Sequence, residues 1–309
     1  MADINRTTNS MALPSDISSE ILQKTQQESA IMRLARRIEL PGRGVTIPVI
    51  TGDPTAAWVA ETGVKPVSNG TPGTKLMQAF KIAVIETFSK EFIRDIPALY
   101  DALVQRLPGA LAGVFDGTIV GAVPAPSQSN FDTFAGCTAQ SILNANNGTY
   151  LGMVAADADI ATHGGVMNGF AFGAQARALL LTAVDTTNRP LFLASANDGV
   201  VDKVLGVPAY FNKNIYKAGA SSGSVPAIVG IAGDWTQAMY GTVAGVEISV
   251  TDTASLTVGS GNDATTINLW QQNMVAVRAE IEVGFRADTS CFNLLTGAIP
   301  SCWSNLSID

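Results

Sequence analysis

The sequence predicts an α+β fold, and three patterns carry this prediction. Hydrophobic residues recur at helical spacing after position 94, they alternate as in a strand before position 288, and a turn-rich excursion separates two apolar runs near position 65. The chain has 309 residues, enough for about two domains. Its middle part alternates short helical and strand segments, as an α/β or α+β domain does.

The excursion at residues 53–86 predicts a long β-hairpin around which the chain is organised. We expect the outward strand at Ala56–Val64 and the return strand at Lys75–Ile85, because the residues between them are rich in Pro, Gly, Ser and Asn. Strands of this length are roughly 35–40 Å long. A lone hairpin cannot bury both faces. We therefore expect it to lie on a neighbouring copy of the chain, with packing on its own domain as the alternative.

The N-terminal segment has the pattern of an arm. Residues 1–14 are polar, a helical pattern starts at Ser15 or Asp16, and a second short one covers Ser29–Ile38. The sequence LPGRG at 40–44 resists helix continuation and separates these helices from the rest. We expect the arm to fold against a neighbouring subunit, with docking on its own domain as the alternative. Its apolar residues are Leu13, Ile17, Ile21, Ile31, Leu34 and Ile38.

A helix is predicted at 94–116, with a core stripe from Ile96 to Phe115 and a kink or break at Pro108. The last strand, within 269–287, alternates an apolar face with a face of opposite charges. Further helical runs are expected at 138–144, 157–161 and 174–184, and further strands at 45–50, 169–172, 205–211, 227–231 and 246–250.

The composition favours a chain that buries surface between subunits. It is 47% hydrophobic and only 15% charged, against about 25% charged residues in an ordinary soluble domain. The net charge of −7 argues against a dedicated nucleic-acid binder. No apolar run is long enough to predict a membrane span. An odd count of three cysteines favours reduced thiols, and with one histidine they predict no metal site and no cofactor.

The sequence offers no convincing active site. Gly219–Gly223 matches a nucleophile elbow by letter, but a proline and a strand follow where that motif needs a helix. The single histidine, His163, precedes Ser221, against the order of such triads. Asp157 and Asp159 beside a helix are better explained as caps than as an acid–base pair. We therefore predict no enzyme.

The order of these pieces resembles the major capsid proteins of tailed bacteriophages, with the Hong Kong-97-type fold. The resemblance covers about residues 13–297. It is carried by LPSDISSEILQK and SAIMRLARRIELPG, TIPVITGDPTAAWVAETG and KIAVIETFSKEFIRD, DTTNRPLF before LGVPAYFN, VGIAGDW, and NMVAVRAEIEVGFRADTSCFNLLTG.

The resemblance implies an arm, an extended loop, a peripheral domain built on a long spine helix and long strands, and an axial α/β domain. The expected segments are the arm at 1–44, a peripheral-domain strand at 45–52, the extended loop at 53–86, the spine-helix region at 87–122, the axial domain at 123–256, peripheral return strands at 257–297 and a tail at 298–309.

The resemblance also implies hexamers and pentamers in an icosahedral shell. Such a shell encloses double-stranded DNA without sequence-specific binding, assembles in the bacterial cytoplasm and becomes part of the virion. Scaffold, portal and decoration proteins could be further partners, and no membrane is implied. An encapsulin-type nanocompartment shell is the alternative, and an α/β hydrolase a remote one.

Two departures from the family bear on these expectations. Some members carry a scaffolding segment ahead of the arm, whereas this chain begins almost at the arm. Some members cross-link through a Lys–Asn bond, for which nothing in this sequence identifies a partner of Lys65 or Lys75. The remaining subunit-interface candidates, including cross-subunit ion pairs, are Trp58, Glu61, Lys65, Lys75, Phe80, Arg278, Glu282 and Arg286.

Overall fold

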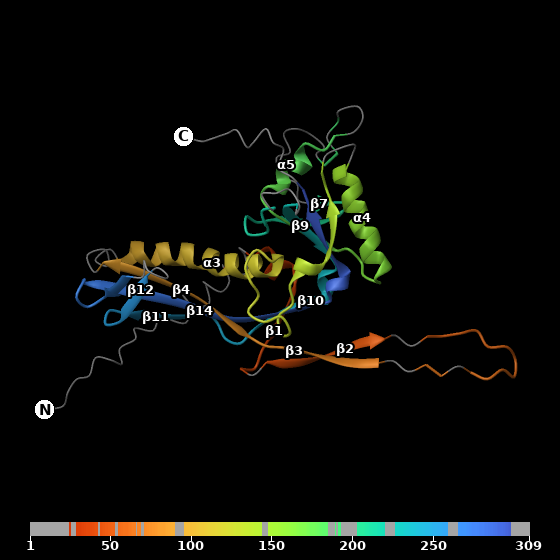
Figure 1. Ribbon diagram of the computed structural model, residues 1–309, viewed down its shortest axis with the longest axis horizontal. Coiled ribbons are helices and arrows are strands. Elements are labelled where there is room, and N and C mark those ends of the chain that lie inside the picture. Colours follow the sequence, from red (N-terminus) through yellow and green to blue (C-terminus); the bar gives the residue numbers. More distant parts are fainter. Residues whose placement is uncertain are drawn as a thin grey trace.

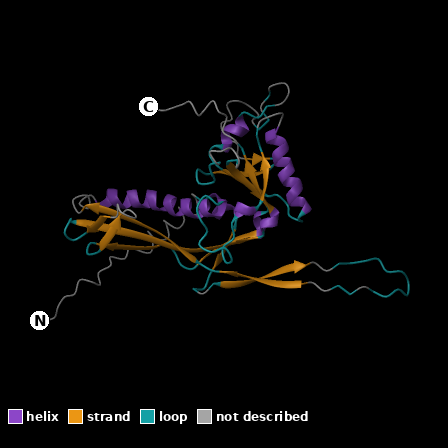
Figure 2. Ribbon diagram, in the orientation of Figure 1, coloured by secondary structure: helices purple, strands orange, loops and turns teal. Residues whose placement is uncertain are grey.

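The structure, a computed structural model, shows two packed bodies and a long projection (Figure 1). It describes residues 25, 29–42, 44–52, 55–65, 67–68, 71–89, 96–143, 148–184, 189, 191–192, 203–219, 226–258 and 265–297. Helices and strands are both present, as the sequence predicts (Figure 2). In this part of the chain, no helix has the length and apolar character needed to cross a membrane.

The elongated body contains a twisted sheet with the long helix α3 lying along it (Figure 1). In the described residues its strands follow the order β1-β10-β14-β11, and β4 also pairs with β14, antiparallel from Met274↔Ser89 to Val283↔Phe80. The bounds are α2 Ala30–Leu34, β1 Arg36–Glu39, β4 Phe80–Ser89, α3 Ile96–Val120, β10 Ala238–Thr242, β11 Glu247–Thr251 and β14 Met274–Ala287.

Helix α3 covers one face of this sheet because its apolar stripe meets the inward side chains of β14. Leu107 and Leu111 are buried against Val277 and Ile281. At ~1.5 Å per residue, its 25 residues extend over roughly 38 Å. The helix continues through position 108, so the break expected there is absent. The predicted strand at the end of the chain is confirmed as β14, and its alternating residues from Val275 to Phe285 are buried.

The second body is a sheet with two helices on one face. The described strands follow the order β5-β15-β9-β6-β8-β7, and residues of α4 and α5 share one core cluster with Phe170 and Phe172. The bounds are η3 Phe134–Gly136, β5 Thr138–Ser141, α4 Gly148–Thr162, β6 Gly169–Phe172, α5 Ala176–Leu181, β7 Lys203–Val204, β8 Val207–Phe211, β9 Ile228–Gly233, η4 Trp235–Gln237, η6 Thr289–Cys291 and β15 Phe292–Thr296.

The expected helix at 138–144 is wrong. Residues Thr138–Ser141 form strand β5, which pairs in parallel with β15. The segment is too short to show either period clearly, so pairing with β15, a distant part of the chain, decides its conformation. The segment expected as peripheral return strands, 257–297, divides between the two bodies: β14 lies in the elongated body, whereas Phe292–Thr296 form the buried strand β15 of the second sheet.

An aromatic core joins the two bodies. Phe285 of the elongated body lies 5.6 Å, centroid to centroid, from Phe134, whose ring stacks on Phe292 of the second body at 4.4 Å. Trp235 contacts both Phe134 and Phe292 edge to face. Rings of this size contribute much apolar area and prefer such geometries. The two bodies are therefore held by one continuous core.

The projection is a hairpin of β2 (Val45–Gly52) and β3 (Thr71–Met77), with register from Val45↔Met77 to Gly52↔Thr71. This differs from the expected strands. Residues 45–52 are the outward strand of the hairpin and not a strand of the peripheral domain, and residues 55–60 are not assigned to a strand. The expected return strand is divided: after Met77 the chain leaves the hairpin and enters the sheet as β4. A second small ladder joins β12 Ser255–Val258 to β13 Thr265–Asn268.

Candidate assembly surfaces

The base of the hairpin is fixed to the elongated body by Arg286. Its guanidinium donates from Nε to the carbonyl of Leu76 at 2.8 Å and from Nη2 to the carbonyl of Ser129 at 2.6 Å. Nη1 pairs with Asp132 at 2.9 Å, and the other oxygen of Asp132 accepts the backbone N–H of Ala287 at 3.1 Å. Arg286 is only 6% exposed. Such a buried, multiply hydrogen-bonded cation fixes three segments relative to one another.

Two glycines allow the chain to cross the sheet at this point. Gly241 of β10 and Gly284 of β14 face each other in the ladder. A Cβ at Gly284 would lie 2.5 Å from the carbonyl oxygen of Gln78, and a Cβ at Gly241 would overlap Leu40 and lie 2.9 Å from Sδ of Met77. The missing side chains form a shallow seat in which Met77 is fully buried. We call this seat, together with Arg286 and Asp132, the hairpin anchor.

The far end of the projection carries apolar side chains without cover in the described chain. Trp58 is fully exposed, and Val64 and Val67 are 95% and 90% exposed. The two sides of the loop are joined by a hydrogen bond from the N–H of Thr55 to Oγ of Ser68 at 2.7 Å. Figure 2 shows this loop extending beyond the strands of the hairpin. A surface tryptophan and two valines at the end of a long projection are characteristic of a contact with another molecule.

The charged residues that the sequence suggested as interface candidates lie partly in this loop and partly on or beside the sheet. Glu61 and Lys65 are exposed in the loop, and Lys75 donates to the carbonyl of Ala287 at 3.4 Å. On the sheet face opposite α3, Lys81 pairs with Glu282 at 3.2 Å and Arg278 with Glu280 at 3.1 Å. The Glu282 and Glu280 carboxylates raise the pKa of Lys81. These ion pairs lie within one chain.

Of two further candidates expected to contact a neighbour, Arg286 is buried and Phe80 is partly buried within their own chain. Arg286 belongs to the hairpin anchor. Phe80 opens β4, and its ring packs edge to face on Phe131 at 6.1 Å.

The arm candidates also differ from expectation where the structure describes them. Ile31 is fully buried in the core that joins the two bodies, and Leu34 packs against that core. Ile38 lies in β1, which pairs in parallel with β10 of its own chain. The segment from Ala30 to Glu39 therefore docks on its own body. Leu13, Ile17 and Ile21 lie outside the described residues.

A buried carboxylate holds this docked segment in place. Asp116 of α3 accepts a hydrogen bond from Oγ of Ser29 at 2.5 Å and from the backbone N–H of Ala30 at 3.2 Å. Ser29 in turn caps α2 by accepting the N–H of Met32. Burial raises the pKa of Asp116 to about 7, although donors from Ser29, Ala30 and Asn212 oppose that shift. No local pattern indicates that this aspartate, placed within the predicted helix, turns inward.

The outer face of α4 was not anticipated as a candidate surface. Met153, Ala156 and Ile160 face the core, yet Leu151 and Tyr150 on the other side are 57% and 42% exposed. A helix that is apolar on all sides is normally covered on all sides. The run GTYLGMVAADADIAT contains this signal, because it lacks a polar face along its first half.

In the described part of the chain, the residues considered for catalysis do not come together into a reactive arrangement. His163 is exposed, and its Nδ1 lies 2.9 Å from the carbonyl oxygen of Asp159. Ser221 lies outside the described residues. Burial raises the pKa of Cys137 to about 12 and also raises that of Cys291, so neither is a thiolate near neutral pH. No group of three metal-ligating side chains occurs in the described part.

In the comparison with known proteins, one protein family matches nearly the whole chain. The sequence pattern of the phage capsid family matches residues 9–289. A similar protein is the probable major capsid protein gp17 of Mycobacterium phage L5, which is 28% identical over 301 residues and aligns over 90% of this chain and 87% of its own length.

Solved structures share the fold. A chain from Microbacterium phage Oxtober96 superposes with a TM-score of 0.69 at 23% identity, over 88% of this chain and 91% of that chain. A chain from the capsid of a native GTA particle, computed with C5 symmetry, superposes with a TM-score of 0.59 at 13% identity, over 89% and 90%. The mixed helix and sheet architecture is therefore that of these particle proteins.

Replacing Arg286 tests the hairpin anchor. Arg286→Met should lower the free energy of unfolding by about 3–5 kcal/mol, because it leaves Asp132 and two carbonyls without their buried partner. Arg278→Met is the matched control: it lies on the same strand, its side chain is 45% exposed, and its loss should cost less than about 1 kcal/mol. Denaturant unfolding of the subunit measures both. Equal losses would contradict the role given to Arg286.

Asp116 predicts a pH dependence of stability. Its pKa is about 7 in the folded chain against an ordinary value of 3.8, so between those values the folded chain binds more protons than the unfolded chain. The stability contributed by this group is complete below about pH 4 and is lost as the pH rises to about 7.

The matched comparison is Asp116→Asn, whose side chain does not titrate. Relative to Asp116→Asn, the wild type should lose free energy of unfolding as the pH rises from about 4 to about 7. Above that range the difference between the two proteins should stay constant. A difference that is independent of pH would show that this carboxyl is not perturbed.

Proposed function

The chain belongs to the phage capsid family and is a structural shell protein of a tailed-phage virion; from this premise we propose that it assembles as hexamers and pentamers into an icosahedral shell enclosing double-stranded DNA. The match over residues 9–289 agrees with the resemblance drawn from the sequence. The C5 symmetry with which the similar GTA capsid was computed supports the pentamer.

The assembly proposal rests on the difference between the base and the far end of the projection. Its base is held by the buried Arg286, whereas its end exposes Trp58 and Val64 almost completely. A rigid base and an uncovered apolar end are what a subunit needs to reach a neighbour in a defined direction. Full burial of one such side chain contributes about 1.5–3 kcal/mol, and every subunit of a closed shell would repeat the contact.

We propose the Hong Kong-97-type division for this chain, with limits drawn from its contacts. The elongated body with α3 and β14 corresponds to a peripheral domain, and the sheet carrying α4 and α5 to an axial domain. Residues 45–77 correspond to the extended loop. An arm would then comprise the residues before Ser29, because the segment after it docks on its own body through Asp116.

The proposed contacts between copies use the uncovered surfaces. Trp58, Glu61 and Lys65 are the candidates on the extended loop, and Leu151 and Tyr150 on α4 are candidates on the axial domain. Lys75, Arg278 and Glu282 would contribute at most weakly, since each already has a partner in its own chain. Scaffold, portal and decoration proteins stay possible partners in this proposal.

We do not propose catalysis for this chain. Its similar proteins are named as capsid proteins, and its two described cysteines and its histidine show no nucleophile with an adjacent base. The nanocompartment shell and the hydrolase that the sequence left open have no observation in their favour.

Trp58→Ser and Val64→Ser test the assembly role of the loop. Both side chains are almost fully exposed in the subunit, so the free energy of unfolding should change by less than about 0.5 kcal/mol. The yield of closed particles, counted by electron microscopy, should fall several-fold because the contact with the neighbour is lost. Val166→Ser is the matched control, since Val166 is 73% exposed in a loop of the axial domain. Normal particle yields for both loop variants would refute this role.

A further inference from the structure

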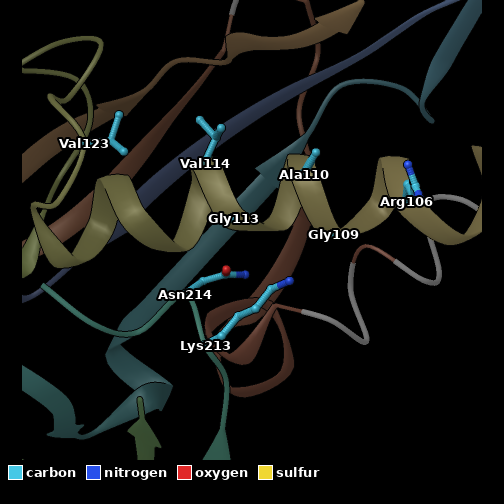
Figure 3. A pocket seen from close by; sticks show the side chains of 8 residues that line it. All are labelled: Arg106, Gly109, Ala110, Gly113, Val114, Val123, Lys213 and Asn214. Carbon is cyan, nitrogen blue, oxygen red and sulfur yellow. The ribbon is translucent and has the colours of Figure 1, made fainter. Parts of the chain in front are cut away.

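An open groove lies beside α3, on the side of the helix that faces away from the sheet (Figure 3). Its volume is about 480 Å³. The helix contributes Arg106 and the glycines Gly109 and Gly113, and the segment after β8 contributes Lys213 and Asn214. The glycines leave the helix backbone uncovered, so a ligand can approach closely there.

The polar side chains that line the groove are hydrogen-bond donors of the kind that bind anions. Arg106 and Lys213 are exposed, and in the described part of the chain neither forms an ion pair with a carboxylate. Figure 3 shows the Lys213 side chain extending from its loop toward the helix. Asn214 adds an amide beside it. This is a cationic groove on a chain whose net charge is −7.

A second hollow continues the groove. It has a volume of about 370 Å³, shares Lys213 and Asn214 with the first, and adds Arg33 and Tyr210. The Arg33 guanidinium stacks over the Tyr210 ring at 4.4 Å, an arrangement that holds the cation in place. Three cations, Arg33, Lys213 and Arg106, therefore line two hollows that share Lys213 and Asn214.

The opposite face of the same body carries charges of both signs, and most of them are paired within the chain. Alternate residues of β14 point away from α3, and among them Glu280 and Glu282, together with Glu247, surround Lys81 and raise its pKa. By strand register Arg278, Arg286 and Arg36 lie on that face as well. Its carboxylates Glu280, Glu282 and Asp132 are paired with cations of the same chain, whereas Arg106 and Lys213 have no such partner in the described part.

We propose that the groove binds backbone phosphates of the enclosed DNA, which places the α3 face toward the interior of the shell. This inference rests on the proposed function. Arg, Lys and Asn side chains are the groups that contact phosphate oxygens without reading sequence. Two or three such contacts per subunit give weak, salt-dependent binding. That agrees with a chain that is not a dedicated nucleic-acid binder.

DNA fits the groove better than an acidic polypeptide does. A stable peptide site needs buried apolar pockets for anchoring side chains. The apolar lining of the larger hollow is limited to small side chains, chiefly Ala110, Val114 and Val123, beside the two glycines of the helix. A phosphate backbone needs only donors and close access.

The test is binding of a short, labelled DNA duplex of mixed sequence to the purified full-length chain, followed by fluorescence anisotropy over a series of salt concentrations. Lys213→Gln should reduce the slope of log affinity against log salt by about 1, and the double variant Arg106→Gln/Lys213→Gln by about 2. Lys203→Gln, which removes the same charge from exposed strand β7, should leave the slope unchanged.

A second variant changes the shape of the groove and not its charge. A Cβ at Gly113 would make only ordinary contacts, the nearest with Oδ1 of Asn214 at 3.5 Å, so Gly113→Ala should fold. It should weaken DNA binding by obstructing the groove. Equal slopes for Lys213→Gln and Lys203→Gln would overturn the inference. The inference would also be overturned if poly-glutamate displaced the duplex at a lower concentration of charge than unlabelled DNA does. That result would indicate that the groove binds an acidic polypeptide.

Electron microscopy of the same variants separates the two proposals. Closed particles without groove-dependent DNA binding would overturn only the phosphate site. Failure of the wild-type chain to form particles would overturn the proposed function instead.

Discussion

The contacts of Arg286 determine where the body of this subunit ends and its projection begins. One guanidinium binds the carbonyl of Leu76 at the end of the hairpin, the carbonyl of Ser129 in a loop, and the carboxylate of Asp132. Because the cation is nearly buried, each of those acceptors depends on it. The Gly241 and Gly284 pair supplies the space in which Met77 crosses the sheet. Without both features, the hairpin would have no fixed direction relative to α3.

In the proposed assembly, stability and association depend on different parts of the chain. The aromatic core around Phe134 and Phe285 and the strand pair β4–β14 make the subunit a single unit. The uncovered surfaces proposed for association are the loop around Trp58 and the outer face of α4. This division explains the low charge content, since a chain that covers much of its surface with copies of itself needs fewer charged groups for solubility. It also lets weak contacts suffice, because a closed assembly repeats them.

The sequence was most informative where one period continued over many residues. The stripe of α3 and the alternation of β14 depend on local spacing, and both were predicted correctly. The division of the expected return strand was not predictable, because alternation continues from Lys75 to Ile85 and only the glycine seat on distant strands shows that the chain leaves one sheet and joins another. The burial of Arg286 and Asp116 was not predictable for a related reason: a charged residue in a periodic segment is normally expected to be exposed, and only tertiary contacts show that these two are buried. The exposed side of α4 was visible in the sequence as a missing polar face.

We propose that the projection is fixed at its base by its own chain and covered at its end by another copy. Hydrogen exchange of the free subunit and of assembled particles distinguishes the two ends. Amides of β4, residues 80–89, should be protected in both states, because they pair with β14. Amides of residues 55–65, which form no ladder in the subunit, should exchange rapidly when free and become protected on assembly. Equal exchange of residues 55–65 in the two states would contradict the account.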